Sequence, residues 1–308
     1  MINLNGIEVE NPLVVSSGAW GYGLPSLTRP FDPTKFGAIV TRTLTIGERW
    51  GNLGISPVKP DRFFEQLLWG FEILKKRKDV LRKIPSGWIN YMGWWNIGID
   101  RYINDVYPKT KEVPIIVSIG GFSIEEYLEM IRKLNELKIL AVELGVSCPN
   151  VKIDWEKDVL LFGKLMEQCR EESKHPLIVK LSVKGDFLAR AHIAEALGIN
   201  AISAINTIKG LIVNPKTGEF FYGGISGKRI KEIALLVVSE IRKVVDLPII
   251  GGGGIYSWKD CKQFFWAGAD AVSFGSVFFF QPWKPTQIVK RHQKEAEKLV
   301  QRIKKIRK

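Results

Sequence analysis

Short apolar segments alternate along this chain with amphipathic ones. The apolar segments are rich in Val, Ile, Leu and Ala, and they predict β-strands at residues 12–17, 38–45, 114–120, 141–147, 177–182, 201–206, 248–254 and 271–277. Several are apolar at almost every position, as expected of strands buried on both faces. Amphipathic patterns predict helices at residues 123–137, 159–173, 188–197, 228–244 and 257–267. Strands and helices in this order indicate βαβ units around a parallel sheet.

The number of predicted strands favours one large α/β fold over two smaller domains. A chain of 308 residues is long enough for either, but no linker or low-complexity segment divides this one, and the strands fit a (β/α)8 TIM barrel. We therefore predict a single barrel domain over residues 1–308. Residues 46–105, after the second strand, depart from the alternation and are rich in Trp and Gly. Because long connections usually have a function, we expect this insertion to fold over the barrel mouth.

Composition limits the compartment and the kind of site. The N-terminus lacks a signal-peptide pattern, and no apolar run approaches the ~20 residues of a membrane span. The three cysteines are odd in number and widely spaced, which suits a reducing cytosol and argues against a disulfide framework or a Cys-rich metal site. The three histidines form no metal-ligand pattern. We expect a cytoplasmic protein with no membrane partner and no metal.

Positive charge is concentrated in two places. The formal net charge is +13, and much of it comes from residues 75–78 and from a C-terminal tail in which basic and apolar residues alternate. The tail pattern predicts an amphipathic closing helix. A solvated surface is the simplest interpretation of the charge, and contact with an acidic partner subunit or with RNA is the functional alternative.

Polar residues follow several predicted strands. The carboxyl ends of the strands of a barrel meet on one face, where active sites lie. The strand at 141–147 is followed by Cys148-Pro149-Asn150, which places a thiol at this edge. Pro149 should end the strand, because proline cannot donate to a sheet ladder. A buried structural cysteine and a reactive one both fit this segment.

Glycine is concentrated near the ends of the last two strands. Residues 251–254 are all glycine, and Gly275-Ser276 ends the eighth strand. Loops at these positions often bind phosphate in such barrels, since glycine lets backbone N–H groups approach the anion. Residues 223–227, before a predicted helix, would add a third group of donors.

Lys180 interrupts an apolar strand, where a charge is costly unless it is paired or used. A salt bridge at the barrel rim and a cation that faces an anionic or electron-rich cofactor are the two interpretations.

Taken in order, these motifs resemble the class 1 dihydroorotate dehydrogenases, flavin enzymes with a (β/α)8 barrel. The resemblance covers most of the chain and rests on the order and spacing of short motifs. They are Asn11-Pro12, Ser16-Ser17-Gly18, Thr43 with Gly51-Asn52, residues 90–96, Ser147-Cys148-Pro149-Asn150, residues 179–182, Ile205-Asn206-Thr207, residues 223–227, residues 253–255 and Gly275-Ser276.

The resemblance implies a single FMN-binding domain with a small pyrimidine substrate. The residues expected to bind the cofactor are Ser17, Gly18, Thr43, Lys180, Gly223, Gly224, Gly253, Gly254, Gly275 and Ser276. The glycines and Ser276 would hold the phosphate. Lys180 would lie near the flavin ring, where a positive charge stabilises the reduced, anionic form. The residues expected to hydrogen-bond the substrate are Asn90, Asn150, Asn206 and Thr207.

The resemblance also assigns catalytic roles. Cys148 matches the catalytic base, which removes a proton from C5 of the dihydropyrimidine while hydride leaves C6 for the flavin. Arg42 stands where the family usually has a lysine that touches flavin and substrate. Two further departures are Gly145, where the family has asparagine, and the bulky pair Trp94-Trp95. These departures bear on the substrate rather than on the cofactor.

Three alternatives to a dihydroorotate dehydrogenase stay open. The first is a related FMN oxidoreductase for another dihydropyrimidine or an enone. The second is an RNA-modifying flavoprotein of the dihydrouridine synthase type, although no RNA-binding domain follows the barrel and nucleic acid is not expected as a partner. The third is a flavin-binding subunit that has lost catalysis.

The electron acceptor in the family is fumarate, or NAD reached through an iron–sulfur flavoprotein partner. This chain has no cysteine cluster and no convincing nicotinamide-binding fingerprint. We therefore expect an electron-transfer partner subunit, together with assembly into a homo-oligomer.

Overall fold

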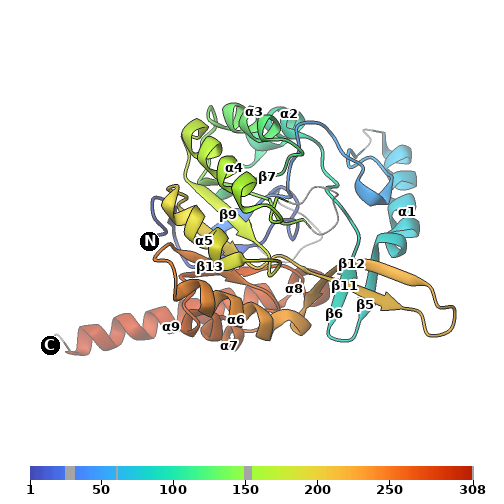
Figure 1. Ribbon diagram of the computed structural model, residues 1–308. Coiled ribbons are helices and arrows are strands. Elements are labelled where there is room, and N and C mark those ends of the chain that lie inside the picture. The colour runs from blue at the N-terminus through green and yellow to red at the C-terminus, as the bar shows by residue number, and fades with distance from the viewer. Residues whose placement is uncertain (25–31, 60–61, 149–154, 307–308) are drawn as a thin grey trace.

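The computed structural model describes residues 1–24, 32–59, 62–148 and 155–306. Its centre is a closed barrel of eight parallel strands (Figure 1). They are β3 (Leu13–Val15), β4 (Ala38–Val40), β7 (Ile115–Ile119), β8 (Ala141–Leu144), β9 (Leu177–Leu181), β10 (Ala201–Ala204), β13 (Ile249–Gly252) and β14 (Ala271–Phe274). Each lies within one of the predicted strands, so the (β/α)8 TIM barrel is confirmed.

Helices cover the outside of the barrel, as predicted. They are α3 (Ile124–Leu134), α4 (Val159–Glu172), α5 (Phe187–Ala196), α6 (Lys231–Arg242), α7 (Trp258–Trp266), α8 (Val277–Phe280) and the closing α9 (Lys284–Ile306). Four of them begin after a side chain whose oxygen accepts a backbone N–H of the first turn, which is why the helices start there. These caps are Ser123, Asp158, Asp186 and Ser257. A 3₁₀ turn, η5 (Lys228–Ile230), precedes α6.

Alternation along the strands divides the core into two apolar clusters. Residues such as Val142 and Val179 face outward and pack under the helices. Their neighbours Ala141 and Ile178 face inward and fill the barrel together with Leu4 and Ile7. The last two lie around the turn between β1 (Ile2–Asn3) and β2 (Glu8–Val9), which therefore closes the amino-terminal end of the barrel.

The barrel interior becomes polar toward its carboxyl end. Because side chains alternate with a period of two, the residue two positions beyond each inward apolar residue also faces inward. These positions form what we call the polar layer: Ser16, Arg42, Ser118, Glu143, Lys180, Ser203, Gly252 and Ser273. The sequence thus places charge and hydroxyls in the barrel directly below its open face.

The insertion after the second strand forms more regular structure than the sequence indicated. Its elements are η2 (Gly51–Leu53), α1 (Phe63–Val80), β5 (Leu81–Ile84), β6 (Gly87–Asn90), α2 (Ile99–Arg101), the π-helical turn η3 (Tyr102–Val106) and η4 (Tyr107–Lys109). An earlier 3₁₀ turn, η1 (Pro33–Lys35), precedes β4.

A second insertion, after β10, was not predicted. Its strands β11 (Ile208–Val213) and β12 (Phe220–Gly227) join the first insertion in an antiparallel sheet of order β11-β12-β6-β5 (Figure 1). Residues 223–227, expected before a helix as a third group of N–H donors, are part of strand β12, which leads into η5. The hairpin escaped the sequence analysis because it belongs to no βαβ unit.

Two structural findings bear on the kind of protein. No helix in the described part of the chain is both long and apolar enough to cross a bilayer. Within the same residues, no group of three or more His, Cys, Asp or Glu side chains is arranged to hold a metal ion.

Candidate active site

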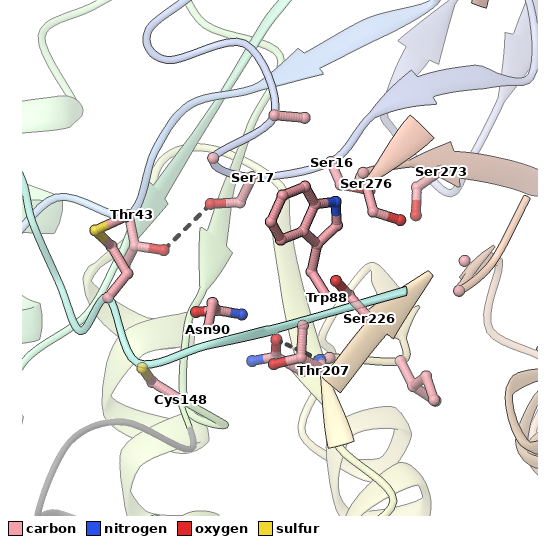
Figure 2. A pocket seen from close by; sticks show the side chains of 18 of the residues that line it. Ser16, Ser17, Thr43, Trp88, Asn90, Cys148, Thr207, Ser226, Ser273 and Ser276 are labelled. Atoms are coloured by element: carbon pink, nitrogen blue, oxygen red, sulfur yellow. Dashed lines mark hydrogen bonds between the residues drawn. The ribbon is translucent and has the colours of Figure 1, made fainter. Parts of the chain in front are cut away.

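A cavity of about 360 Å³ lies at the carboxyl end of the barrel, between the strand ends and the sheet of the two insertions. Figure 2 shows that Trp88 and Asn90 of β6 reach over it from the sheet. Cys148 and Thr43 lie on one side, and Ser273 and Ser276 on the other. The insertion therefore folds over the barrel mouth, as predicted.

Most of the residues predicted from sequence line this one cavity. The lining includes Ser17, Gly18, Arg42, Thr43, Asn90, Cys148, Lys180, Asn206, Thr207, Gly253, Gly254, Gly275 and Ser276. Asn150 lies outside the described residues. Segments far apart in the sequence thus meet at the face where the strand ends converge.

Gly223 and Gly224 have a different place from the one predicted. They pair with β6 and β11 inside the sheet and do not line the cavity. A Cβ at Gly223 would lie 2.4 Å from the carbonyl oxygen of Asn90, so only glycine lets β12 and β6 approach this closely. The Asn90 Nδ2 also donates to the Gly224 carbonyl at 3.0 Å. These glycines position Asn90, and the cavity is lined by Ser226 and Gly227 farther along β12.

The loops after β13 and β14 form a glycine cradle. Gly253 and Gly254 have φ of 139° and 74°, values that favour glycine. A Cβ at Gly254 would lie 2.9 Å from the carbonyl oxygen of Gly227. Nearby, the hydroxyls of Tyr256 and Ser276 are hydrogen-bonded at 3.1 Å. This side of the cavity offers closely spaced backbone and hydroxyl groups, which suit a phosphate.

The thiol side is tied together by hydrogen bonds. The Ser147 hydroxyl donates to the carbonyl of Lys180 at 2.8 Å, and Asn206 Nδ2 donates to the Ser147 carbonyl at 2.9 Å. The Asn206 Oδ1 accepts the N–H of Thr207 at 2.7 Å. These contacts fix the backbone directly before Cys148 to Lys180 of β9 and to Asn206, which follows β10.

Cys148 differs from the other two cysteines. It is half-buried and lines the cavity, whereas Cys169 and Cys261 are buried behind the barrel strands. Burial raises the pKa of the Cys169 thiol to about 12 and also raises the pKa of Cys261. Because the thiolate is the reactive form, those two are structural, and Cys148 is the candidate for chemistry.

Two cations border the cavity. The Lys180 Nζ lies 3.9 Å from Oε1 of the buried Glu143. Arg42 stacks on Trp95 with its guanidinium carbon 5.1 Å from the ring centroid, and within the described residues no carboxylate lies within ion-pair distance of it. Burial lowers the pKa of Arg42, although a guanidinium stays protonated in proteins. The cavity is therefore electropositive, which suits an anionic ligand.

Aromatic residues complete the lining, and only the pair Trp94-Trp95 among them was singled out from the sequence. Trp94 is 6% exposed and packs edge-on against Phe122 at 5.1 Å. A Cβ at Gly120 would lie 2.7 Å from the Trp94 ring. The other aromatic residues of the lining are Trp88, Trp95 and Phe279. Trp88 could have been found from the alternation in β6, which puts it on the face of Asn90.

Comparison with known proteins is consistent with this geometry. Residues 78–296 match the model of the family described as dihydroorotate dehydrogenase. The chain belongs to the dihydroorotate dehydrogenase family. This confirms the resemblance predicted from the motifs.

Relatives of the dihydroorotate dehydrogenase family cover most of the chain. A protein of Bacteroides fragilis named dihydroorotate dehydrogenase B (NAD(+)), catalytic subunit, is 33% identical over 296 residues, which is 91% of this chain and 88% of that protein. A protein of the same name from Pelobacter propionicus is 34% identical over 292 residues, or 91% and 88%. One from Aquifex aeolicus, provisionally named dihydroorotate dehydrogenase A (fumarate), is 33% identical over 306 residues, or 94% and 90%.

Proposed function

We propose that this protein oxidises dihydroorotate to orotate in pyrimidine biosynthesis, with FMN as cofactor and Cys148 as base. The observation that carries the proposal is the hydrogen-bonded unit of Ser147, Lys180 and Asn206, which holds Cys148 at the same cavity as the glycine cradle. Family membership supports a reaction at a CH–CH bond.

The residues present fit FMN. Gly253, Gly254, Gly275 and Ser276 would hold the phosphate. At Gly253 and Gly254 a Cβ would collide with its neighbours, so only glycine fits there and the backbone is open to close approach of an anion. Lys180 would lie beside the ring system. When bound, FMN supplies the acceptor for the hydride that leaves C6 of the substrate.

The cavity side chains supply the remaining chemistry. Cys148, as thiolate, takes the proton from C5, so that the loss of a proton and a hydride leaves a C5=C6 double bond. Asn90, Asn206 and Thr207 offer donors and acceptors to the imide edge of the ring. The Arg42 guanidinium offers a two-pronged donor to the substrate carboxylate.

The electrons must then leave the flavin. Relatives named as catalytic subunits support a partner subunit that carries them onward, and we propose the same arrangement here, in a homo-oligomeric cytoplasmic enzyme. The purified protein alone should then turn over slowly with NAD and regain its rate when the partner is added.

Anaerobic bleaching tests the reaction. The purified protein should be yellow, and one equivalent of dihydroorotate should remove the flavin absorbance without oxygen. Colourless protein that cannot be reconstituted with FMN would contradict the whole assignment.

A second candidate is a related FMN oxidoreductase for another dihydropyrimidine or an enone. Gly145 favours it, because a Cβ there would lie 2.9 Å from the carbonyl oxygen of Ile119 and 3.2 Å from Thr43 Cγ2, so this backbone has little space for the asparagine of the family. Yellow protein that dihydroorotate fails to bleach would select this candidate if dihydrouracil bleaches it, or if a cyclic enone reoxidises its chemically reduced flavin.

A further inference from the structure

Glu143 is a charged residue that the proposed reaction does not use. It belongs to the polar layer, its side chain is only 3% exposed, and its Oε1 has no hydrogen-bond partner. Burial of an ionised carboxylate in this way is unfavourable unless a cation offsets it.

Lys180 is that cation. Glu143 is in register with Ile178 of the neighbouring strand, so Lys180 lies two residues nearer the carboxyl end of β9, on the same inner face. The Lys180 Nζ to Glu143 Oε1 distance of 3.9 Å gives attraction without a hydrogen bond. The pair therefore leaves the ammonium donors available to a group in the cavity above.

The rest of the polar layer makes Glu143 important electrostatically. Apart from Glu143, the charged members of the polar layer are Lys180 and Arg42, and the remaining members are serine or glycine. Among the described residues of the layer, Glu143 is thus the acid that offsets two cations. Without it, no acid of the described layer would attract the Lys180 ammonium, and repulsion from Arg42 would act on it unopposed.

We propose that Glu143 is a positioning residue that holds the Lys180 ammonium in place at the cavity, near where the flavin ring would bind, and so sets the reduction potential of bound FMN. This rests on the proposed binding of FMN and does not depend on the identity of the substrate. A cation near the ring favours the reduced, more negative cofactor over the oxidised one. If the Lys180 ammonium moves away from its place, the reduction potential should therefore fall.

Glu143→Gln keeps the shape of the side chain and removes its charge. We expect the affinity for reduced FMN relative to oxidised FMN to fall about tenfold, which is a midpoint potential about 30 mV lower for a two-electron couple. Anaerobic spectroelectrochemistry of the reconstituted protein measures this without any substrate.

Glu156→Gln is the matched control. Glu156 is also buried and paired with a cation, but that cation, Arg190, does not line the cavity as Lys180 does, so the potential should not move.

A second background tests whether Glu143 acts through Lys180. In a Lys180→Met protein the Gln substitution should no longer lower the potential, whereas a merely structural role would lower it equally in both backgrounds. An unchanged or higher potential in the single variant would also overturn the proposal. If the Gln variant does not fold, Glu143→Asp decides in the same way, since a shorter side chain should lower the potential by a smaller amount.

The two proposals fail in different ways. Wild-type protein that takes up no FMN defeats the proposed function. Protein that binds FMN with a potential insensitive to Glu143 defeats only the role of this residue.

Discussion

The two sides of the cavity differ in the chemical groups that form them. The cradle side, after β13 and β14, is built from backbone and hydroxyls, and Gly253 and Gly254 leave no room for a Cβ. The thiol side, around Cys148, is built from side chains that reach in from several strands, with Arg42 stacked on Trp95. The first offers a fixed shape to a group common to many ligands, and the second carries chemistry that a single substitution can change. This explains why the departures from the family pattern fall on the thiol side.

A substitution at the thiol tests the difference between the two sides most directly. Cys148→Ser should keep its FMN, because the cradle is untouched, and should lower the rate of flavin reduction by substrate by about 10²–10⁴-fold, the usual contribution of a positioned base. Anaerobic stopped-flow absorbance measures the rate. Cys169→Ala removes a buried thiol outside the cavity and should leave that rate within about twofold. An unchanged rate in the serine variant would remove Cys148 from the base role.

A substitution on the cradle side should have the opposite pattern. Gly254→Ala introduces a Cβ 2.9 Å from the Gly227 carbonyl at a φ of 74°, so we expect FMN affinity to fall about 10- to 100-fold, from a cost of about 1–3 kcal/mol. Flavin that is still bound should react with substrate at nearly the normal rate. Titration of apoprotein with FMN by fluorescence quenching gives the affinity.

The control for this variant separates backbone strain from the collision in the cradle. Gly218 also has a φ of 72°, but nothing lies within 4 Å of its Cβ position, and it does not line the cavity. Gly218→Ala should therefore lose some stability and no FMN affinity. Equal loss of affinity in both variants would mean that the cradle geometry is not what binds FMN.

The sequence predicted the barrel well because its signals are local. Each strand is an apolar run and each helix an amphipathic one, and convergence of the strand ends then brought Lys180, Cys148 and Gly254 to one face without any knowledge of distances. The same logic could have found the polar layer, since Glu143 and Lys180 each interrupt an apolar strand at an inward position.

What the sequence did not reveal depends on contacts between distant segments. The pairing of β12 with β6 gives Gly223 and Gly224 a structural role that a glycine motif alone does not distinguish from phosphate binding. The packing of Trp94 against Gly120 is likewise visible only when the insertion lies on the barrel. Such contacts join residues with no shared periodicity, so no sequence pattern marks them.

The smallest expected effect comes from a substitution of Arg42, on the thiol side. Arg42→Lys keeps the charge but replaces a planar fork by a single ammonium, which loses one of two parallel hydrogen bonds to a substrate carboxylate. We expect KM for dihydroorotate to rise about tenfold, at the low end of the ~1.5–3 kcal/mol of a hydrogen bond to a charged group. FMN affinity should stay within about twofold, because the cradle is unaffected. Steady-state kinetics and FMN titration of the same preparation test both halves of this prediction. A lower KM in the lysine variant would show instead that Arg42 selects against dihydroorotate, and this result would favour the second candidate function.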